Sequence, residues 1–239
     1  MSDTLAGIAA STMNKELRFP LLALLGLLAV VPARAQIITD NAILPANLAV
    51  PDNDTVGVSS TLAFNSAIED ITDVNVWLNL SGGWNGDLFV SLEHDSGLAV
   101  LLNRVGRRTA DLTGYSDAGF DVTLDDQAAN GDVHLYRLTL FGNANKPLTG
   151  ALTGAWAPDG RPADPLLALD TSPRTDFLSS FNGLNPNGAW TLVVKDVSPG
   201  DTSTLVSWGI EVTGIVPEPA AAWLLLLGVP GLLWLRRRA

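Results

Sequence analysis

The chain contains two histidines, His94 and His134, the side-chain type that most often transfers protons near neutral pH. A serine hydrolase needs such a histidine beside a serine and an oriented carboxylate. His94 precedes Asp95 in a turn-like stretch, and His134 lies in an alternating segment on the side that we expect to face solvent. Neither a G-x-S-x-G motif nor an H-E-x-x-H motif is present. The sequence therefore favours structural roles for both histidines.

Acidic side chains are the other groups that could carry chemistry. A pair such as Asp125 and Asp126 resembles the carboxylates of a glycosidase, although an acidic surface loop contains such pairs without catalysing anything. Calcium binds six to eight oxygens from carboxylates and turn carbonyls, and aspartates are frequent here at the ends of expected strands. The candidate calcium ligands are Asp87, Asp126, Asp196 and Asp201. An acidic surface that serves solubility alone is the alternative.

Aromatic side chains offer a possible contact surface. Trp84 and Trp156 stand in loop-like segments, so we expect them at the surface, where they could contact a partner or a sugar. Trp190 and Trp208 stand in alternating segments and are expected in the core.

Composition restricts the class of protein. With no cysteine, the chain can form neither a disulfide framework nor a thiolate site. Between residues 36 and 219 there are 8 basic and 23 acidic residues, a net charge of −15. Such a surface repels nucleic acid and anionic lipid, and it suits an exported soluble domain.

The N-terminal 35 residues have the pattern of a signal peptide. Lys15 and Arg18 precede an uncharged apolar run over 19–31, and small residues at Ala33 and Ala35 give an A-x-A-like cleavage site. We expect cleavage after Ala35. A retained membrane anchor is the alternative, and Met13 is a better initiator than Met1 for a segment of this kind.

The C-terminus, 215–239, combines three parts in order. Pro217, Glu218 and Pro219 precede an uncharged apolar run over 220–235, and Arg236, Arg237 and Arg238 follow it. As a helix the run would span about 24 Å, somewhat less than the ~30 Å hydrocarbon core. The arginines would remain cytoplasmic by the positive-inside rule.

This tail resembles the PEP-CTERM sorting signal of Gram-negative bacteria. The resemblance implies an exosortase that recognises the motif and cuts near it. The protein would be anchored transiently in the inner membrane, then released to the cell envelope, surface or extracellular matrix.

Between the two ends, apolar residues alternate with polar ones in short runs. A period of two is typical of strands with one buried face, and turn signals such as N-G-D and N-P-N-G separate the runs. We expect strands within 56–64, 74–80, 88–92, 120–124, 133–139, 190–194 and 205–212, and an irregular excursion over 142–174. The pattern predicts an all-β, antiparallel, jelly-roll-like β-sandwich over 36–214, flanked by a signal helix and a short transmembrane helix.

Four blocks of this region resemble the P domain, or P/Homo B domain, of proprotein convertases. They are N-G-D-L-F-V-S-L (85–92), F-D-V-T-L-D-D-Q-A (120–128), F-N-G (181–183) and N-G-A-W-T-L-V-V-K-D (187–196). In kexin- and furin-type convertases this domain follows the subtilisin-like catalytic domain, which it stabilises and regulates. The sequence departs from the family pattern at His94-Asp95, where Ser-Pro is usual, and at Ser203, where glycine is usual.

These features lead to one expectation and two alternatives. We expect an exported, non-catalytic module that is processed by signal peptidase and exosortase and has a binding or structural role, for example on extracellular polysaccharide. It could instead be an accessory to a secreted subtilisin-like protease, or a cryptic hydrolase using its acidic loops.

Overall fold

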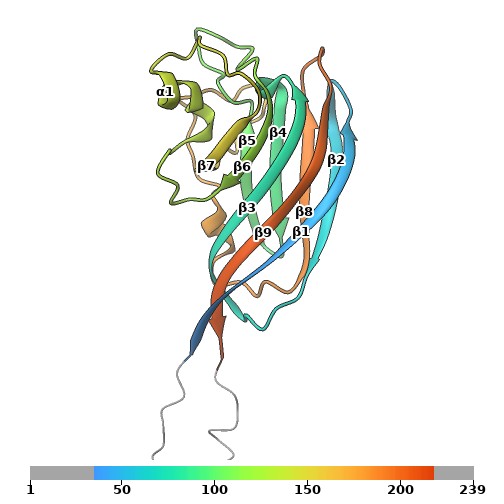
Figure 1. Ribbon diagram of the computed structural model, residues 1–239, viewed down its shortest axis with the longest axis vertical. Helices are drawn as coiled ribbons and strands as arrows, with labels where there is room; N and C mark the ends of the chain where they lie inside the picture. Colours follow the sequence, from blue (N-terminus) through green and yellow to red (C-terminus); the bar gives the residue numbers. More distant parts are fainter. Residues whose placement is uncertain (1–34, 218–239) are drawn as a thin grey trace, which may run out of the picture. The chain divides into compact units, whose positions relative to one another are not determined.

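The computed structural model describes residues 35–217, and their strands form two facing sheets (Figure 1). One sheet has the order β1-β9-β3-β6-β7 and the other β2-β8-β4-β5, and every neighbouring pair is antiparallel except β6 with β7. The strands are β1 (Gln36–Val50), β2 (Asp54–Phe64), β3 (Asp70–Gly83), β4 (Leu88–His94), β5 (Gly97–Asn103), β6 (Ala118–Leu124), β7 (Leu152–Trp156), β8 (Gly188–Asp196) and β9 (Ser203–Val216). The prediction of an all-β sandwich is confirmed.

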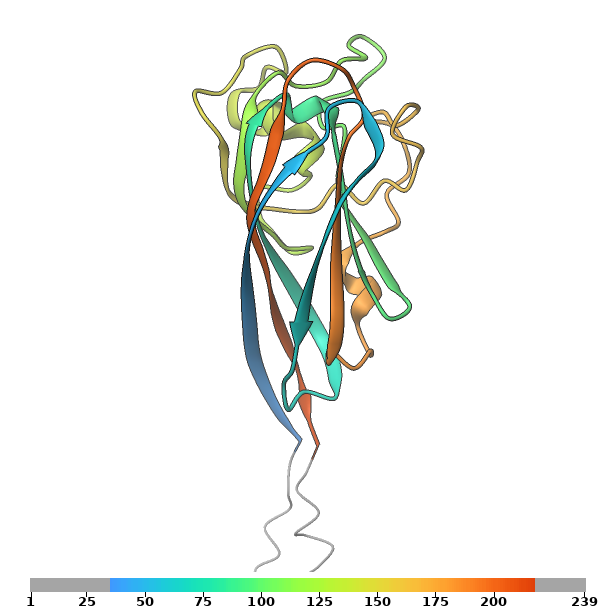
Figure 2. The same ribbon diagram turned by 90° about the vertical axis from the view of Figure 1, so that its right-hand side faces the viewer.

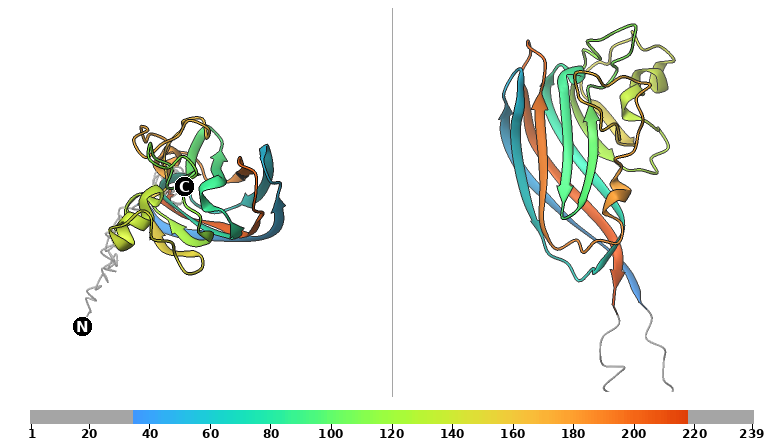
Figure 3. Two further views of the ribbon diagram at one scale, coloured as in Figure 1. Left: turned by 90° about the horizontal axis from the view of Figure 1, so that it is seen from above. Right: turned by 180° about the vertical axis from the view of Figure 1, so that it is seen from behind.

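The core lies between the two sheets. Figure 2 shows the layers from the side, and the right-hand view of Figure 3 shows the four-stranded sheet in front. On β3, Val74, Val76, Leu78 and Leu80 all point inward and are buried. They pack with inward residues of the opposite sheet in one apolar cluster, where each fully buried side chain of this size contributes about 1.5–3 kcal/mol. The period-two pattern thus identified the buried face of β3.

Strand β1 brings the two ends of the described chain together. It pairs with β9 from Gln36 opposite Val216 to Val50 opposite Ser203. Residue 36 follows the expected signal cleavage site, and residue 217 begins the expected sorting motif. Both therefore leave the sandwich at the same end.

Three predictions about local structure were wrong. The excursion over 142–174 is not wholly irregular, because it contains the strand β7, which pairs with β6. The segment 133–139 is not a strand but a 3-10 turn, η2 (Val133–Leu135), followed by the helix α1 (Tyr136–Phe141). The Asp132 side chain accepts the backbone N–H of His134 and so starts the turn, and Gly142, in the left-handed region, ends the helix. Val56 is the first apolar residue of the alternating run 56–64, which places it on the expected buried face. It is exposed instead, because the register of β2 against β8 shifts between Asp54 and Val58.

Several sequence predictions lie outside the described residues. Nothing of the signal peptide before Ala35 is described, and neither are Ala33, Glu218, Pro219, Arg236, Arg237, Arg238 or the apolar run 220–235. Over residues 35–217, the helices are all too short or too polar to cross a bilayer.

Candidate functional site

The N-G-D motif forms a short 3-10 turn, η1 (Asn85–Asp87), at the start of β4. Asn85 is completely buried. Its Oδ1 accepts the backbone N–H of Gly119 at 2.8 Å, and its Nδ2 donates to the carbonyl oxygen of Gly119 at 3.2 Å. A Cβ atom on Gly86 would lie 2.6 Å from a backbone carbonyl oxygen of the neighbouring loop, so a larger residue does not fit. The contacts of Asn85 and Gly86 therefore hold the backbone at Asp87 in one position.

Asp87 and Asp196 lie side by side at the end of the sandwich. Asp196 stands opposite Leu88 in the β4–β8 ladder, and the backbone N–H of the following residue, Val197, donates to the carbonyl oxygen of Asp87 at 2.9 Å. The Oδ1 of Asp87 accepts from Nη2 of Arg104 at 3.2 Å. Arg104 is the positive charge of this site, and no local sequence pattern indicates it.

Asp196 is the unsatisfied carboxylate of the pair. It is buried, and its Oδ2 has no hydrogen-bond partner. Burial, together with the negative charges of Asp87 and Asp52, raises its pKa to about 6. Burial also raises the pKa of Asp87, although Arg104 opposes this.

Of the four candidate calcium ligands, three lie in this region and one does not. Asp201 is in the β8–β9 loop, close enough for its charge to raise the pKa of Asp87. Asp126 instead accepts the backbone N–H groups of Leu178 and Ser179 at 3.1 and 2.8 Å. Its place is at the 3-10 turn η3 (Leu178–Phe181).

The acidic end does not form a ready calcium cage. Within residues 35–217, no three His, Cys, Asp or Glu side chains are grouped so as to hold a metal ion. Arg104 already binds one of the two adjacent carboxylates. Asp196 Oδ2 remains as the free oxygen, and the calcium hypothesis stays a prediction.

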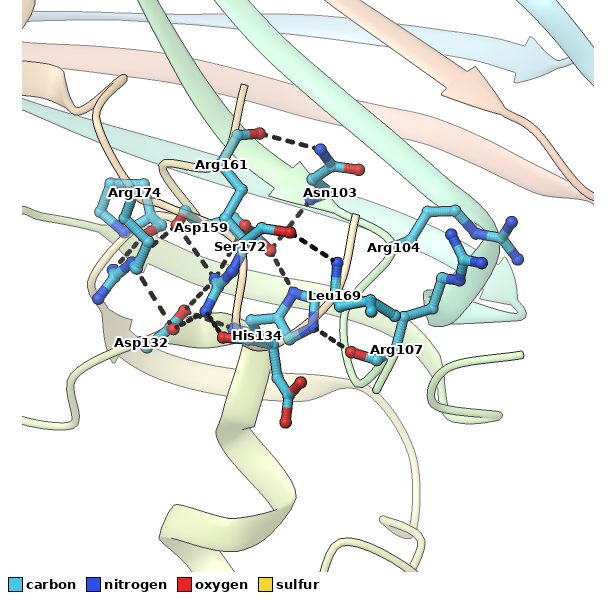
Figure 4. Close-up of polar contacts among 12 residues, drawn as sticks. Asn103, Arg104, Arg107, Asp132, His134, Asp159, Arg161, Leu169, Ser172 and Arg174 are labelled. Atoms are coloured by element: carbon cyan, nitrogen blue, oxygen red, sulfur yellow. Dashed lines mark hydrogen bonds and ion pairs between the residues drawn. The ribbon is translucent and has the colours of Figure 1, made fainter. Parts of the chain in front are cut away.

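His134 lies in a buried ionic network rather than at the surface (Figure 4). Its Nδ1 lies 2.7 Å from Oδ2 of Asp159, and its Nε2 lies 2.9 Å from the carbonyl oxygen of Arg107. The opposite oxygen of Asp159 accepts from Arg161 at 3.0 Å, and Arg161 also donates to Asp132 at 2.8 Å. With Arg174, whose Nε lies 3.6 Å from Oδ2 of Asp132, three basic side chains thus surround the two carboxylates of Asp132 and Asp159.

This network ties the irregular excursion to the sandwich. Asp159 and Arg161 follow β7, whereas His134 belongs to η2. Nδ2 of Asn103, at the end of β5, donates to the carbonyl oxygens of Arg161 and Ala163 at 2.9 and 2.8 Å. The sequence prediction that His134 faces solvent was wrong. The two groups that hydrogen-bond to its buried ring are 25 or more residues away in the chain, so no local pattern indicates them.

His94 is also fully engaged. Its ring nitrogens lie 3.0 and 2.7 Å from the carbonyl oxygens of Ala189 and Asn185. The ring stacks on Trp190, with centroids 4.1 Å apart. Neither histidine of the chain thus has a ring nitrogen free to accept a proton from a nucleophile, as a serine hydrolase requires.

The two tryptophans predicted at the surface have different positions. Trp156 is completely buried in β7, and its indole N–H donates to the carbonyl oxygen of Thr153 at 2.9 Å. It therefore cannot contact a partner directly. Trp84, which precedes η1, is half-buried, and its indole nitrogen is enclosed without a partner. Trp190 and Trp208 are buried in the core, as expected.

A comparison with protein families matches residues 169–212 to the model of the proprotein convertase P-domain. The predicted resemblance to the P domain is confirmed over these residues. The matched P-domain segment contains η3, β8 and most of β9, and with them Asp196, Asp201 and Trp190. The blocks at 181–183 and 187–196 lie inside it, and those at 85–92 and 120–128 lie outside it.

Two solved structures resemble this P-domain-like chain. They are the serine protease of Aeromonas sobria in complex with its chaperone ORF2 (15% identity) and the serine protease of Aeromonas sobria (13% identity), each with a TM-score of 0.41. Each match covers 75% of this chain and 27% of the protease chain. The chain thus spans about a quarter of the length of those proteins. Among curated proteins, none matches this chain.

Proposed function

We propose that this chain is an exported, non-catalytic P-domain-like module that an exosortase releases to the cell envelope or extracellular matrix, where it binds or organises other components. The observation that carries the proposal is the pairing of Gln36 with Val216. A module processed after Ala35 and near Pro217 has both processing points at one end of the sandwich.

This placement suits a domain that is held at a membrane before release. The loops that carry Asp87, Asp196 and Asp201 lie beyond the Ser203 end of β9, away from Val216. While the C-terminal segment is anchored, those loops would project outward. The engaged nitrogens of His94 and His134 support a role other than histidine-dependent hydrolysis.

Fractionation of the host tests the proposal. The wild-type protein is expected outside the inner membrane, with Gln36 as its first residue and without the run 220–235 by mass spectrometry. Replacing Pro217, Glu218 and Pro219 with alanine should retain the intact C-terminus in the inner membrane. The exposed Glu69→Ala variant serves as the control and should be processed normally. A wild-type protein that keeps its C-terminus would overturn the proposal.

A second candidate function, as an accessory to a secreted subtilisin-like protease, is favoured by a group of exposed leucines. Arg107 donates from Nε to the carbonyl oxygen of Leu112 and from Nη1 to that of Pro165, at 2.8 and 2.7 Å. This holds two loops together, and Leu112, Leu166 and Leu167 are all exposed there. Neighbouring exposed leucines are typical of surfaces that bind protein partners.

The accessory role predicts that the chain protects its protease. The thermal inactivation half-life of a co-secreted subtilisin-like protease should lengthen when the wild-type chain is added. A variant with Leu112, Leu166 and Leu167 changed to serine should give no protection, whereas changing the exposed Val56 to serine should have no effect. Equal half-lives with and without the wild-type chain would exclude this role.

A further inference from the structure

The outer face of the five-stranded sheet contains a shallow groove that runs across its strands. Its lining includes Ile43, Trp77, Asn79, Asp121 and Ser207, from β1, β3, β6 and β9. Figure 1 shows β1, β9 and β3 in front, with no helix lying over them. We call this surface the Trp77 groove.

The register of the sheet explains why a groove forms at this position. Trp77 stands opposite Gly209 of β9, and Gly209 in turn stands opposite Ile43 of β1. Since side chains of paired residues lie on the same face, Trp77 and Ile43 flank a position that has no side chain, and the Ile43 side chain leans over it. A Cβ atom on Gly209 would lie 2.5 Å from a backbone carbonyl oxygen of β1, so glycine is needed there.

The next row across the sheet is polar. Asn79 stands opposite Ser207 on one side and Asp121 on the other. Elsewhere on this face polar side chains bond to each other, as when Asn75 donates to Glu211 at 3.2 Å. In the described part of the chain, the side chains of Asn79, Asp121 and Ser207 have no such partner. This row offers an amide, a carboxylate and a hydroxyl group to a ligand.

Trp77, unlike the core tryptophans, has an indole N–H group without a hydrogen-bond partner in the described part of the chain. The indole N–H groups of Trp156, Trp190 and Trp208 all donate to protein acceptors. That of Trp77 has no protein partner within residues 35–217, and it is not among the enclosed polar groups. Trp77 is half-buried, so its nitrogen and part of its ring are accessible to solvent.

We propose that the Trp77 groove binds a neutral polysaccharide built of pyranose rings. A pyranose has a face of C–H groups and a rim of hydroxyl groups. The C–H face packs against an aromatic ring, and the hydroxyls bond to convergent polar side chains. Trp77 and Ile43 supply the apolar contact, and Asn79, Asp121 and Ser207 supply the hydrogen bonds. This inference rests on the proposed binding role and names its ligand class.

Charge selects a neutral polymer over an acidic one. Asp121 is exposed in the groove, and the region 36–219 has a net charge of −15. Uronate or sulfate groups would be repelled by both. A cationic polymer would bind the acidic surface at many places, so only a neutral polymer can measure binding to the groove itself.

The test is affinity electrophoresis of the purified full chain in gels that contain neutral polysaccharides, namely dextran, soluble β-glucan and galactomannan, or the acidic polymer alginate. At least one neutral polymer should retard the wild-type chain, and alginate should not. Trp77→Ala should weaken binding about tenfold or more, roughly 1.4 kcal/mol. Asn79→Ala and Asp121→Ala should each weaken it several-fold.

Ile37→Ala is the matched control. Ile37 is an exposed apolar residue on the same face of β1, six positions from Ile43, and its loss should leave retardation unchanged. Melting curves show whether each variant is folded. If Trp77→Ala is not folded, binding by the variants Asn79→Ala and Asp121→Ala tests the proposal instead.

The inference is overturned if no neutral polymer retards the wild-type chain, if alginate binds as well, or if the groove variants bind like wild type. None of these results affects the fractionation experiment. The sugar-binding proposal and the export proposal can therefore be rejected separately.

Discussion

Nδ1 of His134 lies 2.7 Å from Oδ2 of Asp159, while Nε2 of the same ring lies 2.9 Å from the carbonyl oxygen of Arg107. A carboxylate and a carbonyl oxygen both accept hydrogen bonds, so both ring nitrogens must donate. The ring is therefore a buried imidazolium paired with a carboxylate. The hydrogen bond and charge of Asp159 raise the pKa of His134 even though burial alone would lower it.

Removal of this imidazolium should destabilise the fold strongly. In His134→Asn, Asp159 keeps Arg161 but loses its second cationic partner, and the Arg107 carbonyl keeps only the backbone N–H of Asp170 as a donor. We expect the free energy of unfolding in urea to fall by about 2–4 kcal/mol. The exposed Glu93→Gln variant should remain within about 0.5 kcal/mol of wild type. A loss below about 1 kcal/mol in His134→Asn would contradict the ionic pairing.

The same pair predicts a pH dependence above neutrality. The pKa of His134 is raised above its ordinary 6.5 in the folded state, so the folded protein holds this proton more tightly than the unfolded chain. Its stabilisation is fully present below pH 6.5 and is lost as the pH rises through the folded pKa. Melting temperatures measured from pH 6 to 9 should fall in wild type and fall less steeply in His134→Asn. Parallel curves would refute the assignment.

Asp196 predicts a second pH dependence in a lower window. Its pKa is about 6 when folded and 3.8 ordinarily, so the free energy of unfolding decreases as the pH rises between these values. Asp196→Asn should be more stable than wild type at pH 7, by up to about 3 kcal/mol. The gain should vanish near pH 4. The exposed Asp70→Asn variant should show no such gain.

The calcium hypothesis can be tested with the same variant. If Asp196 Oδ2 is a calcium ligand, millimolar calcium raises the melting temperature of wild type, chelation reverses the rise, and Asp196→Asn shows none of it. Equal melting temperatures in calcium and in chelator would reject the calcium site. Arg104 would then be the cation that offsets the repulsion between Asp87 and Asp196.

Gly86 should tolerate no side chain. Its Cβ would lie 2.6 and 2.7 Å from two backbone atoms of the adjoining loop, so Gly86→Ala must displace main chain. We expect a loss of at least about 3 kcal/mol. Gly131, which has open space around it, is a matched comparison. In Gly131→Ala the only expected cost is the backbone strain at φ +74°, about 1 kcal/mol. Denaturation curves that coincide for Gly86→Ala and Gly131→Ala would argue against the steric explanation.

The sequence predicted those strands whose two faces differ in polarity. β2, β3, β4, β6, β8 and β9 were found because their inward residues are apolar and most of their outward ones are polar or small. β1 was missed because outward positions such as Ile37 and Ile43 are apolar too. β5 is buried along almost its whole length and lacks alternation altogether.

The site was predictable only in part. Asp87 and Asp196 were identified because each ends or begins a strand-like run. Arg104, Asp159 and Arg161 were not, because their roles depend on contacts between distant segments that no local pattern encodes. Trp156 was misplaced because the irregular composition around it concealed a parallel strand, β7, which buries it.

The long β1–β9 ladder gives the sandwich a direction of mechanical strength. If the Trp77 groove binds a polymer as proposed, a pull on Val216 would run along the axis of β9 and load its hydrogen bonds to β3 in shear. A force that separates Gln36 from Val216 opens the same ladder from its end, one hydrogen bond at a time. The module should therefore resist tension toward its C-terminal tether and yield readily to peeling at its N-terminus.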